Sequence, residues 1–124
     1  MVVLKNERIV GFNWYMQRIT GVLLAIWLLV HFLAIHFSNY RATGGQINFN
    51  WVHQRLQSGW WQAFYEIFGV LVIYHGLYGV YNIFADYDLK PGTRKALVWA
   101  LWIIGLAAIF FGWMALSPFI HGGK

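Results

Sequence analysis

The sequence predicts an all-α membrane protein with three transmembrane helices. It has few charged residues, it contains three long apolar segments, and aromatic residues lie at the ends of these segments. Of its 124 residues, 60% are hydrophobic and only 10% are charged, whereas a soluble domain carries about 25% charged residues. Three apolar segments each approach or exceed the roughly 20 residues that a helix needs to cross the hydrocarbon core. Tryptophan and tyrosine form belts at membrane interfaces, and the ends of these segments carry Trp14, Tyr15, Trp60, Trp61 and Trp99.

The apolar segments cover residues 19–37, 64–85 and 96–119. With the interfacial residues at their ends, we expect helices at about 14–37, 61–85 and 95–118 in a single membrane domain, 1–124. The first segment does not resemble a cleaved signal sequence, because it starts late, is too long and lacks a small-x-small cleavage site. The connection that follows it contains Gly44 and Gly45 and predicts a turn and a short interfacial helix.

Positive charges predict the orientation of the chain. One side of the membrane receives Lys5, Arg8, Arg18, Lys90, Arg94 and Lys95, and the other receives Arg41, Arg55 and Lys124. Because cytoplasmic loops carry the excess of Lys and Arg, we expect the N-terminus and the 86–95 loop on the cytoplasmic side of the cell's inner (cytoplasmic) membrane. The net charge of +5 then marks topology and not a nucleic-acid surface, since no basic run alternates with aromatic residues.

The chain contains no cysteine, which excludes disulfides and thiolate metal ligands from this chain. Metal chemistry within it would depend on histidine, whose neutral imidazole is the commonest metal ligand. Histidines inside a membrane span must face something other than lipid. Since three helices alone make a thin bundle, we expect an obligate partner chain.

His75, in the middle of the second predicted helix, is the first candidate site residue. At 1.5 Å per residue it lies about 16 Å along the helix axis from the rim of this helix at Asp86, well inside the bilayer. The same helix face carries Phe68, Val72, Gly79, Asn82 and Asp86. Gly79, one turn after His75, leaves room for a flat macrocycle, so haem iron is a candidate partner. The alternative is a histidine that hydrogen-bonds a neighbouring helix.

His31 is a second candidate, near the outer end of the first predicted helix. Its helix face also carries Thr20, Leu24 and Trp27. The remaining histidines are interpreted as interfacial, loop or tail residues without a site role: His36, His53 and His121.

Arg18 opens the first predicted span at the cytoplasmic interface. The simpler interpretation is that its guanidinium reaches the lipid headgroups. The other is that it supplies a cation to a haem propionate or a bound quinone, which depends on haem binding at His75.

Two patterns give the chain a family resemblance: His-x3-Gly-x6-Asp-Tyr, from His75 to Tyr87, and Gln-Arg-Ile-Thr-Gly, from Gln17 to Gly21. With them the chain resembles the hydrophobic anchor subunits of succinate dehydrogenase (succinate:quinone oxidoreductase, respiratory complex II). It is most similar to the smaller anchor, whose second helix ends in Asp-Tyr. The resemblance covers almost the whole chain, with three helices in the same order and of the same lengths.

The resemblance implies a role for each matched residue. His75 matches the axial ligand of haem b, with Gly79 beside it. Tyr87 matches the tyrosine that hydrogen-bonds a quinone carbonyl, and Asp86 matches its acidic neighbour. Arg18 matches the arginine near the haem propionates and the quinone pocket.

His31 resembles a histidine of the two-haem anchors, which implies a second, distal haem. The implied cofactors are therefore one haem b or two and a quinone, with FAD and iron–sulfur clusters only in partner subunits. The implied partners are the flavoprotein subunit, the iron–sulfur subunit and a second membrane anchor subunit, which would supply the other axial ligand of each haem. The chain would be a non-flavin membrane subunit through which electrons from succinate reach quinone in the respiratory chain and the tricarboxylic acid cycle.

Two alternatives stay open. The anchor of a quinol:fumarate reductase would use the same residues, because the anchor does not determine the direction of the reaction. A small helical transporter or assembly protein would have no redox role. Transporters tend to bury a carboxylate in the middle of the membrane, whereas Glu66 and Asp86 lie at helix ends.

Overall fold

The computed structural model describes residues 2–38, 40–41 and 44–121, with side chains described for 11–38, 40–41 and 44–119. Within these residues the elements are helical: α1 (Val2–Leu33), the π-helix η1 (Ala34–Ser38), α3 (Phe49–Leu56), α4 (Gly59–Ala85) and α5 (Pro91–His121). Three segments of the described chain are long and apolar enough to cross a membrane: Gly11–Ser38, Gly59–Ala85 and Pro91–Phe119. The predicted fold class, an all-α protein with three transmembrane helices, is confirmed.

α1 is longer than the apolar pattern predicts. The expected start was near residue 14, whereas the helix begins at Val2. The segment before Gly11 contains no proline or glycine and includes good helix formers such as Leu4, Lys5 and Glu7. Helix propensity therefore carries α1 past the end of its membrane span, where hydropathy gives no signal.

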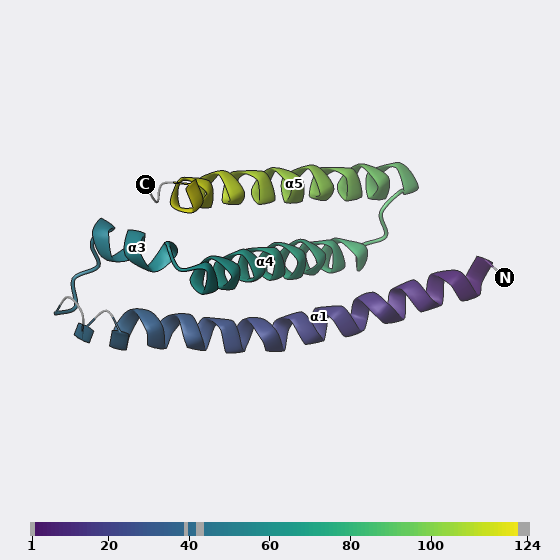
Figure 1. Ribbon diagram of the computed structural model, residues 1–124. Helices are drawn as coiled ribbons and strands as arrows, with labels where there is room; N and C mark the ends of the chain where they lie inside the picture. The colour runs from purple at the N-terminus through teal and green to yellow at the C-terminus, as the bar shows by residue number, and fades with distance from the viewer. Residues whose placement is uncertain (1, 39, 42–43, 122–124) are drawn as a thin grey trace.

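The three long helices lie side by side, with α4 between α1 and α5 (Figure 1). The start of α1 and the α4–α5 connection lie at one end of the bundle, and α3 and the end of α5 lie at the other. This arrangement agrees with the expectation that the N-terminus and the 86–95 loop share one side. Which side of the membrane that is stays a prediction.

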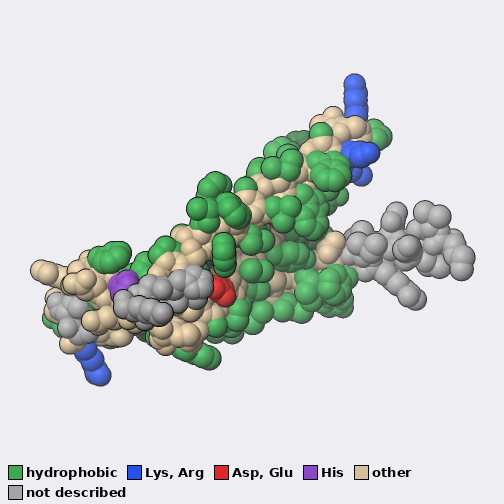
Figure 2. All heavy atoms as spheres, turned by 45° about the horizontal axis from the view of Figure 1, so that its top comes forward, with side chains coloured by type: hydrophobic (Ala, Val, Ile, Leu, Met, Phe, Trp, Pro, Cys, Tyr) green, Lys and Arg blue, Asp and Glu red, His purple; other side chains and the backbone are tan. Residues whose placement is uncertain are grey.

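Few side chains are buried in this arrangement. The buried apolar residues among those described are Leu24, Leu56 and Phe64, while Trp60 is 74% exposed and Trp102 is 64% exposed. Hydrophobic side chains cover most of the face shown in Figure 2, and Lys and Arg side chains gather at its two ends. Apolar surface of this extent marks a membrane or protein interaction site, and its band between two charged ends is typical of a membrane protein.

The connection between α1 and α4 contains the predicted turn and short helix. Gly44 and Gly45 have φ angles of 68° and 93°, in the left-handed region that glycine adopts without strain. The side chain of Asn48 accepts a hydrogen bond of 2.9 Å from the backbone N–H of Trp51 and so caps the N-terminus of α3.

α4 and α5 approach each other closely at Gly105, which is a buried residue of α5. A Cβ atom added at Gly105 would lie 2.8 Å from Cδ1 of Leu77 and 3.8 Å from Cγ2 of Ile73. Small residues at helix interfaces let two backbones approach in a membrane. Gly105 therefore leaves room for the side chains of Leu77 and Ile73 against α5.

We predict that Gly105→Leu destabilises the folded protein by about 1–3 kcal/mol, the usual range for overpacking. Gly112→Leu is the matched control, because Gly112 lies on the same helix and a Cβ there would meet nothing within 4 Å. Both changes raise helix propensity equally, so the two variants differ only in the free energy of packing against α4. Thermal unfolding of the purified membrane protein in detergent measures it, and equal midpoints for the two variants would contradict this account of the interface.

Candidate functional site

The interface between α1 and α4 contains a row of polar contacts. The Nε2 group of Gln17 donates to the backbone oxygen of His75 at 3.1 Å. The indole N–H of Trp27 donates to the backbone oxygen of Phe64, also at 3.1 Å, and the Trp27 ring stacks on Phe64 with 5.6 Å between ring centroids. Both candidate histidines belong to this row.

His75 points from α4 toward α1. Its Nδ1 lies 3.1 Å from the hydroxyl oxygen of Thr20, a residue that is only 6% exposed. The next residue is Gly21, where an added Cβ would lie 3.2 Å from Cε1 of His75. Thr20 and Gly21 thus form a seat for the imidazole ring, in which Nδ1 is hydrogen-bonded and Nε2 has no hydrogen-bond partner among the described residues.

Gly79 lies one turn beyond His75, as the helical spacing predicts. An added Cβ at Gly79 would lie 3.3 Å from Nε2 of Gln17. The space that Gly79 leaves is therefore used by the Gln17 side chain of α1, so that α1 and α4 approach closely at this level.

His31 contacts α4 nearer the other end of the bundle. Its Nδ1 lies 3.2 Å from the hydroxyl oxygen of Tyr65, and its ring stacks on Phe68 with centroids 6.1 Å apart. The two candidate histidines lie at different levels of the α1–α4 interface, because His31 contacts Tyr65 and Phe68, whereas His75 contacts Thr20.

Arg55 of α3 closes this end of the interface. Its Nη1 donates to the backbone oxygen of Ala34 at 3.4 Å, and its guanidinium carbon lies 3.4 Å from the ring centroid of Trp61. Its Nε and Nη2 atoms are buried without a hydrogen-bond partner. Burial lowers the pKa of Arg55 from its usual range, while Tyr65 opposes the shift. From the sequence, Arg55 appeared only as a topology charge.

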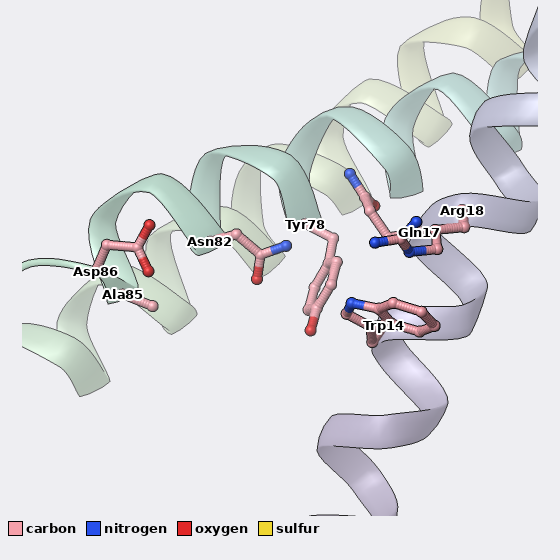
Figure 3. A pocket seen from close by; sticks show the side chains of 7 residues that line it. All are labelled: Trp14, Gln17, Arg18, Tyr78, Asn82, Ala85 and Asp86. Atoms are coloured by element: carbon pink, nitrogen blue, oxygen red, sulfur yellow. The ribbon is translucent and has the colours of Figure 1, made fainter.

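A pocket with a volume of about 390 Å³ opens between α1 and α4 at the end of the bundle that holds the α4–α5 connection. It is lined by Trp14, Gln17, Arg18, Tyr78, Asn82, Ala85 and Asp86. In Figure 3 the first three come from α1 and the others from α4. The guanidinium carbon of Arg18 lies 3.9 Å from the ring centroid of Trp14, so a cation–π contact holds it at the pocket.

Asp86 and Tyr87, the predicted acid and phenol of the site, have different positions. Asp86 is the C-cap residue of α4 and lines the pocket. Tyr87 is 64% exposed and is not among the lining residues. The lining of the pocket therefore includes Arg18 and Asp86 but not Tyr87.

Three residues of the site were missed as such by sequence reasoning. Gln17 and Tyr78 line the pocket, and Thr20 holds the imidazole of His75. Gln17 and Thr20 stand in the pattern that carried the family resemblance, but nothing in a single sequence pairs them with a helix that begins some 40 residues later. The signal that could have found Gln17 and Thr20 is polarity, because both are polar residues in the first half of an apolar span.

These features define the class of protein: a multi-pass, helical membrane protein with a pocket at one end that includes Arg18 and Asp86, and with histidines in the interface of two spans. Comparison with known proteins then shows the family. Residues 6–112 match the family described as succinate dehydrogenase/fumarate reductase transmembrane subunit. The succinate dehydrogenase hydrophobic membrane anchor subunit of Thermoplasma acidophilum is 30% identical over 100 residues, covering 81% of this chain and 79% of that protein.

The chain belongs to the family of succinate dehydrogenase/fumarate reductase transmembrane subunits. It is a membrane anchor and, as such, a subunit of an enzyme complex. The resemblance that the two sequence patterns indicated is confirmed.

Proposed function

We propose that the chain anchors a succinate:quinone oxidoreductase in the cytoplasmic membrane and forms part of its quinone site and haem site. The observation that carries this proposal is the pocket, which has Arg18 of α1 and Asp86 of α4 among its lining residues in a chain of this family. The partners would be the flavoprotein subunit with FAD, the iron–sulfur subunit and a second membrane anchor subunit. The start of α1 and the 86–95 loop would face the cytoplasm, because most Lys and Arg residues lie on that side.

The pocket offers a quinone both donors and a source of protons. Arg18 has five N–H donors, Tyr78 an O–H donor and Asn82 an amide donor, and a quinone carbonyl oxygen accepts from any of them. Reduction of a quinone to a quinol consumes two electrons and two protons. Asp86 is an exposed residue at the C-terminal end of α4, and its carboxylate would pass protons from water to the pocket. Tyr87 would contact the quinone head group at the exposed rim, where the iron–sulfur subunit would dock.

His75 fits a haem ligand by its donor chemistry. Its Nδ1 is hydrogen-bonded to a helix neighbour and its Nε2 has no partner among the described residues, which is the usual state of a metal-ligating imidazole. A haem bound there would supply a one-electron carrier within reach of the quinone site. Arg18 would supply a cation to a propionate of this haem. Gly79 would contribute by letting α1 and α4 approach closely next to His75.

The proposal also includes a second haem, bound at His31. His31 has the same arrangement as His75, with Nδ1 near a hydroxyl group of the neighbouring helix. Arg55, whose Nε and Nη2 have no acceptor, lies near this histidine and carries a charge that a propionate would neutralise. The second membrane anchor subunit would provide the opposite axial ligand.

The direction of the reaction separates the proposal from its nearest alternative, an anchor of a quinol:fumarate reductase. A transporter or assembly protein without redox function is a weaker alternative, since Glu66 is exposed and Asp86 lies at the end of α4. Two measurements on the complex purified from its membrane decide among the three. A haem spectrum separates the redox proteins from the third class, and comparison of succinate oxidation with fumarate reduction by quinol separates the first two.

We predict that His75→Ala removes one haem from the purified complex, because the same helix face offers no replacement ligand one turn on at Gly79. A pyridine haemochrome assay, expressed as haem per flavin, measures the loss. His36→Ala is the matched control, since His36 lies in η1, is exposed and stacks on Phe32 with centroids 4.2 Å apart. Full haem content in the His75 variant would exclude this residue as a ligand.

We predict that Tyr87→Phe lowers quinone reduction by about threefold to tenfold, the effect of losing one hydrogen bond to the substrate. Succinate oxidation with a soluble artificial acceptor should stay intact, because that acceptor takes electrons before the quinone site. Tyr40→Phe is the control, as Tyr40 is similarly exposed, at 69% against 64% for Tyr87, but lies at the other end of the bundle. Equal losses with both acceptors would indicate a defect of assembly instead.

We predict that His31→Leu removes about half of the haem if two haems are bound, and that the haem left behind keeps its spectrum. The physical reason is the distance along the helices, which prevents His31 and His75 from sharing one iron. Tyr65→Phe serves as a companion variant that keeps the imidazole and removes only its hydroxyl partner. Retention of all haem in His31→Leu would leave this residue a packing contact, which contributes only about 0.6 kcal/mol in a membrane bundle.

A further inference from the structure

Thr20 is a buried polar residue in the first span, and its hydroxyl group has more neighbours than it has protons. The oxygen lies 2.7 Å from the backbone oxygen of Met16 and 3.2 Å from that of Gln17. It also lies 3.1 Å from Nδ1 of His75. A threonine hydroxyl has one proton and two lone pairs, so it cannot donate a full hydrogen bond to all three neighbours.

The two carbonyl oxygens determine where that proton goes. A carbonyl oxygen can only accept, and two oxygens 2.7 Å apart without a proton between them repel each other. The hydroxyl proton therefore points to the backbone oxygen of Met16, with Gln17 as a weaker second acceptor. Toward His75 the Thr20 oxygen presents a lone pair, and Nδ1 of the imidazole must be the donor.

This assignment sets the tautomer of His75. A neutral imidazole carries one N–H group, and with Nδ1 protonated the lone pair is on Nε2. Gly21 adds a steric condition, because its missing side chain lets the ring lie against α1, 3.2 Å from where a Cβ would stand. Residues of α1 therefore determine both where the His75 ring lies and which of its nitrogen atoms carries the proton, although His75 belongs to α4.

We infer that Thr20 is a positioning residue for the His75 ligand: through its bond to Nδ1 it keeps Nε2 free to bind haem iron and tunes the potential of that haem. This inference rests on the proposed function of His75 and extends it to a residue of another helix. A hydrogen bond from Nδ1–H to an oxygen raises the basicity of the imidazole. A more basic ligand favours ferric over ferrous iron, so the bond lowers the reduction potential of the site.

The test compares Thr20→Val with Thr20→Ser in the complete complex, purified from its membrane. Valine keeps the shape of threonine and removes the hydroxyl group, whereas serine keeps the hydroxyl group and removes the methyl group. We expect Thr20→Val to weaken haem binding about tenfold, the lower end for loss of such a partner, and to shift the midpoint potential of the remaining haem to a more positive value. Thr20→Ser should retain the haem at the potential of the unmodified complex.

A redox titration of the haem bands, with haem counted per flavin, gives both quantities. If Thr20→Val loses all haem, the Thr20→Ser variant distinguishes the two explanations. Haem retention in Thr20→Ser assigns the loss to the missing hydroxyl group, and haem loss in Thr20→Ser overturns the inference. An unchanged potential and haem content in Thr20→Val also overturns it, as does an identical shift in both variants.

His75→Ala separates failure of this inference from failure of the proposed function. If His75→Ala loses a haem while Thr20→Val is indistinguishable from the unmodified complex, His75 remains the ligand and only the role of Thr20 is wrong. If His75→Ala keeps all haem, the proposed haem site itself is wrong and the role of Thr20 falls with it.

Gly21→Ala tests independently whether α1 positions the His75 ring. The added Cβ would stand 3.2 Å from Cε1 of His75, so the ring must move by a few tenths of an ångström while the Thr20 hydroxyl group is retained. We expect a change in the haem spectrum that reports ligand orientation. Gly76→Ala is the matched control on α4, because nothing lies within 4 Å of its added Cβ, and equal spectra in these two variants would contradict the seat formed by Thr20 and Gly21.

Discussion

In hydrocarbon the hydrophobic effect does not drive helices together, so specific contacts must hold α1 beside α4. The described structure has few of them, and most are polar. Gln17, Thr20, Trp27 and His31 each bond α4 from α1. Their positions follow the period of one helix face, so the contacts form a single line along the interface. Each contributes little alone, and the arrangement of the first two spans depends on their sum.

The same line of contacts gives the site its geometry. Gln17 lines the pocket and also donates to the backbone oxygen of His75, so the candidate quinone and haem positions share one side chain. On its opposite side α4 packs on α5, where Gly105 allows a close approach. The middle helix thus packs on α5 through one side and contacts the pocket and both candidate histidine positions through the other. A change in the α1–α4 interface would affect both candidate positions together.

The fold was predictable because a membrane span is a local property of the sequence. The apolar segments and the Gly44–Gly45 turn each depend on neighbouring residues, and the structure contains the three long helices and the turn that they predict. The pocket and the seat of His75 were not predictable in this way. Gln17 and His75 are 58 residues apart, and their contact depends on the rotation and depth of two helices, which hydropathy does not set. The early start of α1 was missed for a related reason, since propensity continues the helix where hydropathy has ended.

Arg55 has a consequence for the biogenesis of the protein. In the nascent chain it is one of the positive charges on the side with fewer of them, where it weakens the charge difference that directs insertion. In the folded chain its guanidinium lies over Trp61 and bonds the backbone of Ala34, so the headgroups no longer compete for it freely. Folding therefore holds this charge against residues of the bundle. In the orientation proposed from the charge count, inversion of the folded chain would carry Arg55 across the membrane and would first break its contacts with Trp61 and Ala34.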